Sequence, residues 1–480
     1  MLHLPRLLAP LVLAAPCILG GCGGTGTETN SSTGAATNSS AQPTPGNGAQ
    51  NGQAQAKAEP AEPVTPVREL DTKQLVDTVK AEVKGGEADK GPTPEAFLWA
   101  PPERGTPPPD EVLTVEVPKG LQALTAGVLV PRYNPLTKAK VELGKQLYFD
   151  QRVSKNGTVS CATCHNPQKG WTDNLPMSVG INGQMGSRSA PTVLNTVYGK
   201  AMFWDGRAPS LEGQAQGPIQ NKIEMGDQSY EEIVKRLRTI SGYTEQFHKV
   251  FGTDVTLDGM AKSIAAFERT ALSGNSPFDR YNGGDAKALS DSQKRGMVLF
   301  GLRLDSEDEF TTDVVLKKAN CTSCHVGFNF TDEQFHNLGV GWDAKTGQFS
   351  DLGRWAATPV GSKNPAEVGA FKTPTLRDIT RTAPYLHNGS ESTLEKVVEF
   401  YDRGGNKNPY LDQDMKPLKL TASEKADLVE FMKALTGEEV KVSLPTLPVG
   451  PDGKTPDPRS ALQTPTETQA LDTLHVPVVR

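Results

Sequence analysis

A chain of 480 residues with a net charge of −6 is long enough for two or three domains, and it lacks the basic field that nucleic-acid binding needs. Hydrophobic residues make up only 36% of it, while 47 glycines and 37 prolines indicate loop-rich domains joined to segments that cannot bury a core. Two of its six cysteines lie in the N-terminal leader and four form two C-x-x-C-H strings, so none remains for a disulfide.

Residues 1–22 have the features of a lipoprotein signal peptide. Arg6 precedes an apolar run over residues 7–19, which is too short to span a bilayer. The run ends in LGGC at residues 19–22, which resembles the lipobox of bacterial lipoproteins; an ordinary signal peptide cleaved nearby is the alternative. We therefore expect a protein on the periplasmic side, either held at the outer membrane by a lipid anchor on Cys22 or free in the periplasm.

Low-complexity segments flank the part of the chain that we expect to fold. Residues 23–95 are rich in glycine, proline and small polar residues for most of their length, which predicts a flexible tether. Residues 438–480 are again rich in proline and threonine, and we expect this tail either to wrap the surface or to stay mobile. The folded part then comprises two domains, residues 96–285 and residues 286–437.

The two predicted domains contain similar patterns. An apolar helical pattern with a central glycine covers residues 142–149 before one C-x-x-C-H string and residues 294–300 before the other. Small c-type cytochromes begin with this order of helix, loop and haem attachment. Strand-like alternation is almost absent, and further helical patterns cover residues 230–238, 257–270, 394–401 and 423–435. The sequence therefore predicts a mainly α protein of two cytochrome c-like haem domains packed together.

Each C-x-x-C-H string predicts one covalently bound haem c. Two thiols three residues apart can bond the two vinyl groups of a haem, and the adjacent imidazole then reaches the iron. A zinc site or a redox dithiol is the alternative, but zinc would need partner cysteines in another pattern, and the export signal favours haem. The residues concerned are Cys161, Cys164 and His165 for the first haem and Cys321, Cys324 and His325 for the second.

The second axial position of each iron decides whether the protein only carries electrons or also binds peroxide or dioxygen. Outside the leader, the remaining histidines are His248, His336, His387 and His475. None of them lies between His165 and His248, the stretch best placed to cover the first haem, so we expect that haem to be five-coordinate. Met177 and Met185 are the alternative ligands there.

Six longer strings carry a resemblance to a known family. They are APTVLN at residues 190–195, FWDGRA at 203–208, GPIQNKIEMG at 217–226, AFERT at 266–270, FKTPTLR at 371–377 and TAPYLHNG at 382–389. In order and spacing these strings resemble the bacterial di-haem cytochrome c peroxidase and MauG superfamily, over residues 130–437. The resemblance implies an oxidoreductase that uses hydrogen peroxide at its N-terminal haem.

The resemblance also implies roles for three residues near that haem. In the family a Gln and a Glu ten residues apart stand on its distal side, and Gln214 and Glu224 match those positions. Glu224 would then move protons during O–O cleavage, while Gln214 holds the peroxide in line. Trp204 matches the family's tryptophan between the haems, where an indole passes electrons between the metals; a buried packing aromatic is the alternative.

The C-terminal haem separates the subfamilies, because the peroxidases use a Met as its distal ligand and MauG-type enzymes use a Tyr. Tyr401 stands at this position, and residues 394–405 contain no methionine. The resemblance is therefore closer to the MauG type, in which a phenolate ligand favours oxidised iron. Met415 and His387 are the other candidate ligands, and a tyrosine that only packs in its helix is a further alternative.

Two departures from the family change what the resemblance implies. The loop of residues 179–189 lacks the distal histidine of peroxidases that need reductive activation, so we expect the first haem to be open in the oxidised protein. The family also binds calcium between its haems, through an Asn side chain and two backbone carbonyls. Thr382 and Pro384 match the carbonyls, but Ser189 replaces the Asn and is a weaker ligand, which leaves calcium an open question.

We predict that the protein reduces H2O2 at the N-terminal haem, with electrons from a small redox protein or from a protein substrate. Tyr401 and the open first haem favour the protein substrate. An electron-transfer cytochrome without catalysis and an oxygenase-like haem enzyme are the alternatives. We further expect His336 to hydrogen-bond a haem propionate or the backbone, and His248 and His475 to lie at the surface.

Overall fold

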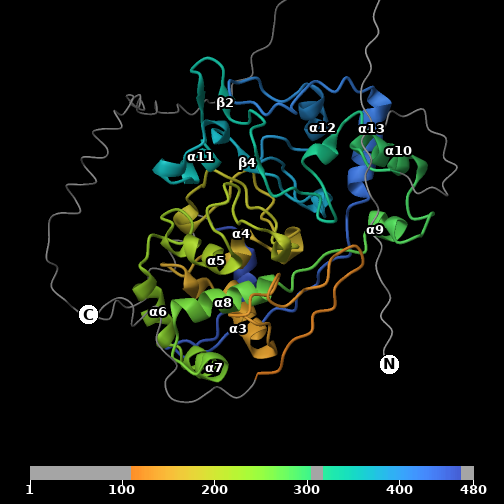
Figure 1. Ribbon diagram of the computed structural model, residues 1–480. Coiled ribbons are helices and arrows are strands. Elements are labelled where there is room, and N and C mark those ends of the chain that lie inside the picture. The colour runs from red at the N-terminus through yellow and green to blue at the C-terminus, as the bar shows by residue number, and fades with distance from the viewer. Residues whose placement is uncertain (1–109, 304–316, 466–480) are drawn as a thin grey trace, which may run out of the picture. The chain divides into compact units, whose positions relative to one another are not determined.

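Helices joined by long loops build the described residues up to 285, called the first half below; the described residues from 286 on are called the second half. The computed structural model describes residues 110–303 and 317–465, and all of these belong to one compact unit (Figure 1). The predicted signal peptide and tether, and His475, lie outside the described residues. The helices before residue 285 are α3 (Lys138–Phe149), α4 (Cys161–Cys164), α5 (Leu211–Gln220), α6 (Tyr230–Arg238), α7 (Ser241–Phe251), α8 (Leu257–Glu268) and α9 (Pro277–Asn282).

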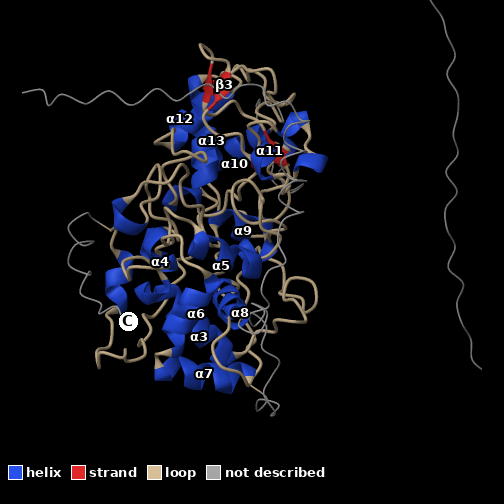
Figure 2. Cartoon of the chain, turned by 90° about the vertical axis from the view of Figure 1, so that its left-hand side faces the viewer, coloured by secondary structure: helices blue, strands red, loops and turns tan. Residues whose placement is uncertain are grey.

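The second half has fewer helices and two short ladders. Its helices are α10 (Asp291–Phe300), α11 (Arg354–Ala357), α12 (Leu394–Asp402) and α13 (Ala422–Lys433). Strand β1 (Phe335–His336) pairs antiparallel with β4 (Phe371–Lys372), and β2 (Trp342–Asp343) pairs antiparallel with β3 (Gln348–Phe349). Helices and loops predominate in Figure 2, which confirms the mainly α prediction, and α6, α8, α12 and α13 lie where the helical patterns predicted them.

The two helices of the predicted repeat, α3 and α10, each cross a later helix at a glycine. Helix α3 packs on α8, and α10 packs on α13 (Figure 1). A Cβ on Gly144 would stand 1.8 Å from the Ser263 carbonyl oxygen, and one on Gly296 would stand 2.0 Å from the Asp427 carbonyl oxygen. Only glycine lets the two backbones come this close. The close approach of a second helix therefore explains the central glycine in both patterns.

Replacing Gly144 with alanine should lower the free energy of unfolding by about 1–3 kcal/mol, because the added methyl group must push α3 away from α8. Thermal unfolding of the haem-loaded protein, followed by circular dichroism, measures this loss. Gly361→Ala is the matched control, since no atom of the described residues lies within 4 Å of the Cβ it would add. Equal melting temperatures for the two variants would contradict the expectation.

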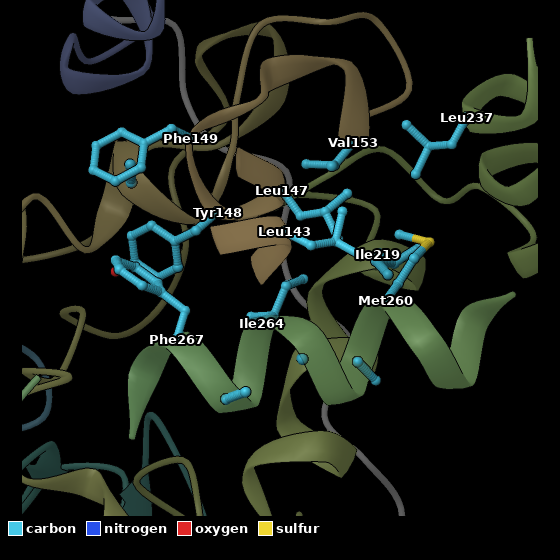
Figure 3. Close-up of a cluster of buried hydrophobic side chains, with 14 of the residues drawn as sticks. Leu143, Leu147, Tyr148, Phe149, Val153, Ile219, Leu237, Met260, Ile264 and Phe267 are labelled. Carbon is cyan, nitrogen blue, oxygen red and sulfur yellow. The ribbon is translucent and has the colours of Figure 1, made fainter. Parts of the chain in front are cut away.

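Two hydrophobic clusters form the interior. The first draws on α3, α6, α7 and α8, and Figure 3 shows Leu143 and Leu147 of α3 directed toward Ile264 of α8. The second includes Phe300 of α10 and Phe431 of α13, whose rings lie 5.2 Å apart. Each cluster thus surrounds one of the two glycine crossings, while the domain boundary between residues 285 and 286 stays a prediction.

A buried ion pair ties the two halves together. The Arg377 guanidinium donates to both carboxylate oxygens of Asp279 in α9, at 2.8 and 2.9 Å, and to the Gly120 carbonyl at 3.0 Å. Both charged side chains are only 2% exposed. Removing either partner of such a pair would leave a buried charge unpaired. This contact therefore holds Arg377 of the second half against α9 and against the segment that contains Gly120.

The C-terminal tail returns to the first half of the chain. The carbonyl of Pro448 accepts a hydrogen bond from Arg152, and the hydroxyl of Ser460 donates to Gln151 at 2.7 Å. Ala461 is fully buried in the first hydrophobic cluster. Of the two alternatives predicted for the tail, its described part therefore wraps the surface.

No helix within residues 110–303 and 317–465 has the length and hydropathy to cross a bilayer.

Candidate functional site

The first C-x-x-C-H string forms the short helix α4 and the residue after it. Ser160 and Thr163 close a capping box at its start, and the Cys161 carbonyl accepts the backbone N–H of His165 at 2.9 Å. The His165 Nδ1 atom donates to the Pro191 carbonyl at 3.0 Å. Because that bond fixes the proton on Nδ1, Nε2 is left with its lone pair for an iron.

The second string repeats this arrangement. Cys321 begins a short 3-10 turn, and the Nδ1 atom of His325 donates to the Phe330 carbonyl at 2.9 Å. Burial lowers the pKa of His165 and of His325, so both imidazoles stay neutral, as metal binding requires. None of the four cysteines of the two strings forms a disulfide within the described residues. Each string therefore presents two thiols and one oriented imidazole, which fits a covalently attached haem.

A cavity of about 290 Å³ opens beside the second string. Its walls include Cys321, Cys324 and His325, together with Tyr401 of α12 and Trp204 from the first half of the chain. The lining is mainly apolar, as a porphyrin ring requires. This cavity is therefore where the second haem fits, and Tyr401 lies on its wall.

The three predicted candidates for the distal ligand all line this cavity: Tyr401, Met415 and His387. Burial raises the pKa of Tyr401, with the sulfurs of Cys321 and Cys324 adding to the shift, and no described residue makes a hydrogen bond with its hydroxyl. His387 is 4% exposed, and its ring stacks on Phe371 at 3.6 Å. Burial lowers the pKa of His387 to about 4.

Glu224 lies near the first string. Ile181 of the 179–189 loop donates its backbone N–H to the Ile223 carbonyl at 3.0 Å, and the Cys164 thiol contacts the Val179 carbonyl at 3.8 Å. Burial, with the charges of Asp173 and Glu224, raises the pKa of the Cys164 thiol. The loop that lacks a histidine therefore lies between the first haem-attachment site and the Glu224 segment.

An asparagine that the sequence analysis missed orients Glu224. Asn221 Nδ2 donates to Glu224 Oε1 at 2.7 Å, while its Oδ1 accepts the backbone N–H groups of Ile223 and Glu224. Burial raises the pKa of Glu224, although Arg207 and Arg188 act against this shift. The three-residue spacing from Asn221 to Glu224 was the available signal, because an Asx turn often fixes the residues that follow it.

Gln214 lies on α5, which begins after a Ser210 side chain that caps the Gly213 N–H at 3.1 Å. The side chain of Gln214 is half-buried, and no hydrogen-bond partner for it lies among the described residues. Helix α5 packs on α8, the helix that supports α3. The amide of Gln214 is therefore available to a ligand.

Trp204 contacts both halves of the chain. Its Nε1–H donates to the Ser189 carbonyl at 2.9 Å, and its own carbonyl accepts the N–H of Lys372 in β4 at 2.8 Å. Trp204 also borders the cavity at the second string.

The predicted calcium residues line the same cavity; they are Ser189, Thr382 and Pro384. Calcium binding by them stays a prediction.

The site can now be compared with known proteins. A family model for di-haem cytochrome c peroxidase matches residues 138–287. The methylamine utilization protein MauG of Methylorubrum extorquens is 42% identical over 320 residues, which make up 66% of this chain and 84% of that protein. The chain belongs to the di-haem cytochrome c peroxidase and MauG family.

Two further members of the di-haem peroxidase family agree with this assignment. The cytochrome c551 peroxidase of Pseudomonas aeruginosa is 36% identical over 333 residues, covering 68% of this chain and 87% of its own. A solved MauG-like protein associated with microbial copper homeostasis aligns with a TM-score of 0.57 and 29% identity, over 72% of this chain and 96% of its own. The protein is therefore a peroxidase-type di-haem oxidoreductase, and its family implies two c-type haems.

His336 contacts side chains rather than the backbone in this di-haem peroxidase. Its Nδ1 contacts Asp412 at 2.7 Å and its Nε2 contacts Asp332 at 2.9 Å, while a hydrogen bond to a haem propionate stays a prediction. The Cys324 sulfur and these two carboxylates raise the pKa of His336 to about 10. His336 is therefore an imidazolium held between two acids beside the second haem-attachment site. His248 is exposed, as predicted.

Glu268, at the end of α8, is a second buried group that the sequence analysis did not single out. It is 5% exposed, and its Oε2 atom has no hydrogen-bond partner among the described residues. Its neighbour Arg269 instead makes two bonds to Glu212, at 2.8 and 3.0 Å. Burial raises the pKa of Glu268 from 4.5 to about 8, although Arg269 opposes this shift.

This acid predicts a pH dependence of stability. Between pH 4.5 and about 8 the native protein keeps a proton on Glu268 that the unfolded chain has lost. The free energy of unfolding should therefore fall as the pH rises through this range, and Glu268→Gln should flatten the fall. Denaturant unfolding near both ends of the range measures it, with the exposed Glu245→Gln as control. An unchanged slope in Glu268→Gln would rule the assignment out.

Proposed function

We propose that the protein reduces hydrogen peroxide at the haem bound by Cys161, Cys164 and His165. The observation that carries this proposal is Glu224, a half-buried carboxyl oriented by Asn221 near Cys164. The adjacent loop of residues 179–189 offers no imidazole to close the iron. A carboxyl group and an open metal face are the two requirements of heterolytic O–O cleavage.

The haem, when bound, supplies the iron that accepts peroxide and the electrons that cleave its O–O bond. Glu224 takes the proton from the near oxygen of the peroxide and returns it to the departing oxygen, which leaves as water. Burial raises the pKa of Glu224 above the ordinary value of a glutamate, which favours its return of the proton to the departing oxygen. The free amide of Gln214 holds the far oxygen in line.

We also propose that Tyr401 ligates the second iron and that Trp204 couples the two sites. No described residue makes a hydrogen bond with the hydroxyl of Tyr401, whereas the ring of His387 is stacked on Phe371. The hydrogen bonds of Trp204 to the Ser189 carbonyl and to Lys372 of β4 support its role in coupling the two sites. A phenolate stabilises oxidised iron, so the second site can hold an oxidising equivalent while a donor approaches.

The electrons come from a small redox protein or from residues of a protein substrate, and Tyr401 favours the second source. The source of the electrons stays a proposal that rests on sequence. So does the location of the protein on the periplasmic side with a lipid anchor on Cys22. The matched relatives include both proteins named as peroxidases and proteins named as MauG. Measuring peroxide consumption with and without a reduced c-type cytochrome separates the two sources.

Electron paramagnetic resonance of the oxidised, haem-loaded protein tests the proposal. We expect one high-spin ferric signal that shifts when cyanide or peroxide is added, and one low-spin signal that does not. Two low-spin haems that ignore both reagents would identify an electron carrier instead. Stable binding of O2, with cleavage of an organic substrate and no need for peroxide, would identify an oxygenase.

A further inference from the structure

An aromatic cluster lies beside the first haem-attachment site, against the segment that carries His165. The Trp171 ring lies 5.9 Å from the Tyr148 ring and 5.9 Å from the Phe267 ring. Trp171 is only 2% exposed, and it belongs to the first hydrophobic cluster. None of the roles proposed above uses this tryptophan.

The cluster is bonded directly to the segment that carries the iron ligand. The Tyr148 hydroxyl donates to the His165 carbonyl at 2.8 Å, and the Trp171 backbone N–H donates to the Asn166 carbonyl at 2.9 Å. The Trp171 carbonyl in turn accepts the N–H of Val193. Val193 lies two residues after Pro191, whose carbonyl accepts the hydrogen bond from the His165 imidazole. Trp171 is thus fixed in the turn that follows the ligand.

Trp171 also borders a second hollow, of about 260 Å³. The hollow is lined by residues 167–171 and Asn174 of the first half, and by Arg381 and Glu439 of the second. This hollow is separate from the cavity at the second string, because the two share only Leu194 in their linings. A small soluble molecule in it would approach the indole without passing Trp204.

We propose that Trp171 is a second oxidisable residue of the peroxide reaction, which supplies an electron to the first haem from the His165 side. This inference rests on the proposed function. Reduction of H2O2 to two waters consumes two electrons and two protons. When Trp171 supplies one of the electrons it becomes an indole cation radical, and an electron from a small phenol or ene-diol reductant in the hollow restores it.

The surroundings favour the tryptophan over the tyrosine next to it. Oxidation of Tyr148 would need a proton acceptor, but its hydroxyl faces a carbonyl, and nearby Glu268 already holds a proton at neutral pH. No described residue accepts a hydrogen bond from the Nε1–H of Trp171, so its proton stays in place when an electron leaves. Electron loss without proton transfer is therefore available at Trp171 alone in this pair.

Rapid-freeze EPR after mixing the haem-loaded protein with peroxide tests the inference. We expect an organic radical signal that narrows when the protein is grown with ring-deuterated tryptophan. The signal should persist in Trp204→Phe and be lost in Trp171→Phe. Trp342→Phe is the matched control, because Trp342 of β2 packs on Phe349 in the other half of the chain. Added ascorbate should shorten the lifetime of the signal.

The optical spectrum of the same samples separates the inference from the function it rests on. If the haem spectrum changes with peroxide while the radical signal survives in Trp171→Phe, the inference is overturned and the proposed function stands. If the haem spectrum does not respond in the wild type, both fail. Should Trp171→Phe not load haem, the deuterium experiment on the wild type decides, because a signal that does not narrow excludes a tryptophan radical.

Discussion

Glu224→Gln should lower kcat/KM for hydrogen peroxide by about 10²–10⁴-fold, the usual contribution of a positioned general acid–base. An amide keeps the size of the side chain and its contact with Asn221, but it cannot carry a proton between the two peroxide oxygens. Stopped-flow mixing of the oxidised protein with peroxide, followed at the haem absorption band, measures the rate. The optical spectrum before mixing shows whether the variant has loaded both haems.

Two companion variants sharpen this test. Glu245→Gln removes an exposed carboxylate of α7 and should leave the rate unchanged. Asn221→Ala should have an intermediate effect, because Glu224 remains but loses the 2.7 Å bond that orients it. Full activity in Glu224→Gln would remove this residue from the mechanism, whatever the companions do.

Tyr401→Phe should convert the second haem from six-coordinate to high-spin, because the phenol oxygen is lost and the ring remains. Tyr401→Met should instead keep six-coordination and raise the reduction potential, by a part of the roughly 0.8 V range that axial ligands span. EPR of the oxidised variants and a spectroelectrochemical titration measure these changes. Storage of an oxidising equivalent at this site should fall in both variants.

Tyr385→Phe is the matched control for this experiment. Tyr385 lines the same cavity, but its hydroxyl already donates to the Ile379 carbonyl at 3.1 Å. Met415→Leu and His387→Gln test the rival ligands in the same way. If the second haem stays low-spin in Tyr401→Phe and becomes high-spin in one of these two, the ligand is the rival.

Local patterns made much of the fold predictable. The C-x-x-C-H strings, the four helical patterns and the central glycines depend on residues close in sequence, and each lies in the structure where it was predicted. The partners of His336 show where such reasoning stops. Asp332 lies four residues before it, but Asp412 lies 76 residues after it, and only the folded chain brings the second acid within 2.7 Å.

Charge pairing was hidden from the sequence for the same reason. Arg269 follows Glu268 directly, yet its guanidinium bonds Glu212, 57 residues earlier, and the Oε2 atom of Glu268 has no hydrogen-bond partner among the described residues. The Pro191 carbonyl that orients His165 lies 26 residues from it. The residues that bind the haems were therefore predictable, whereas most of the groups that hold those residues in place were not.

The returning tail has a consequence for biogenesis. Ala461 fills a place in the first hydrophobic cluster, and Asn166, next to the iron ligand, donates to the carbonyl of Leu462 at 3.2 Å. A nascent chain that has emerged only as far as α8 cannot complete that cluster. The core beside Cys161 and Cys164 is therefore complete only after residues 461 and 462 have been delivered.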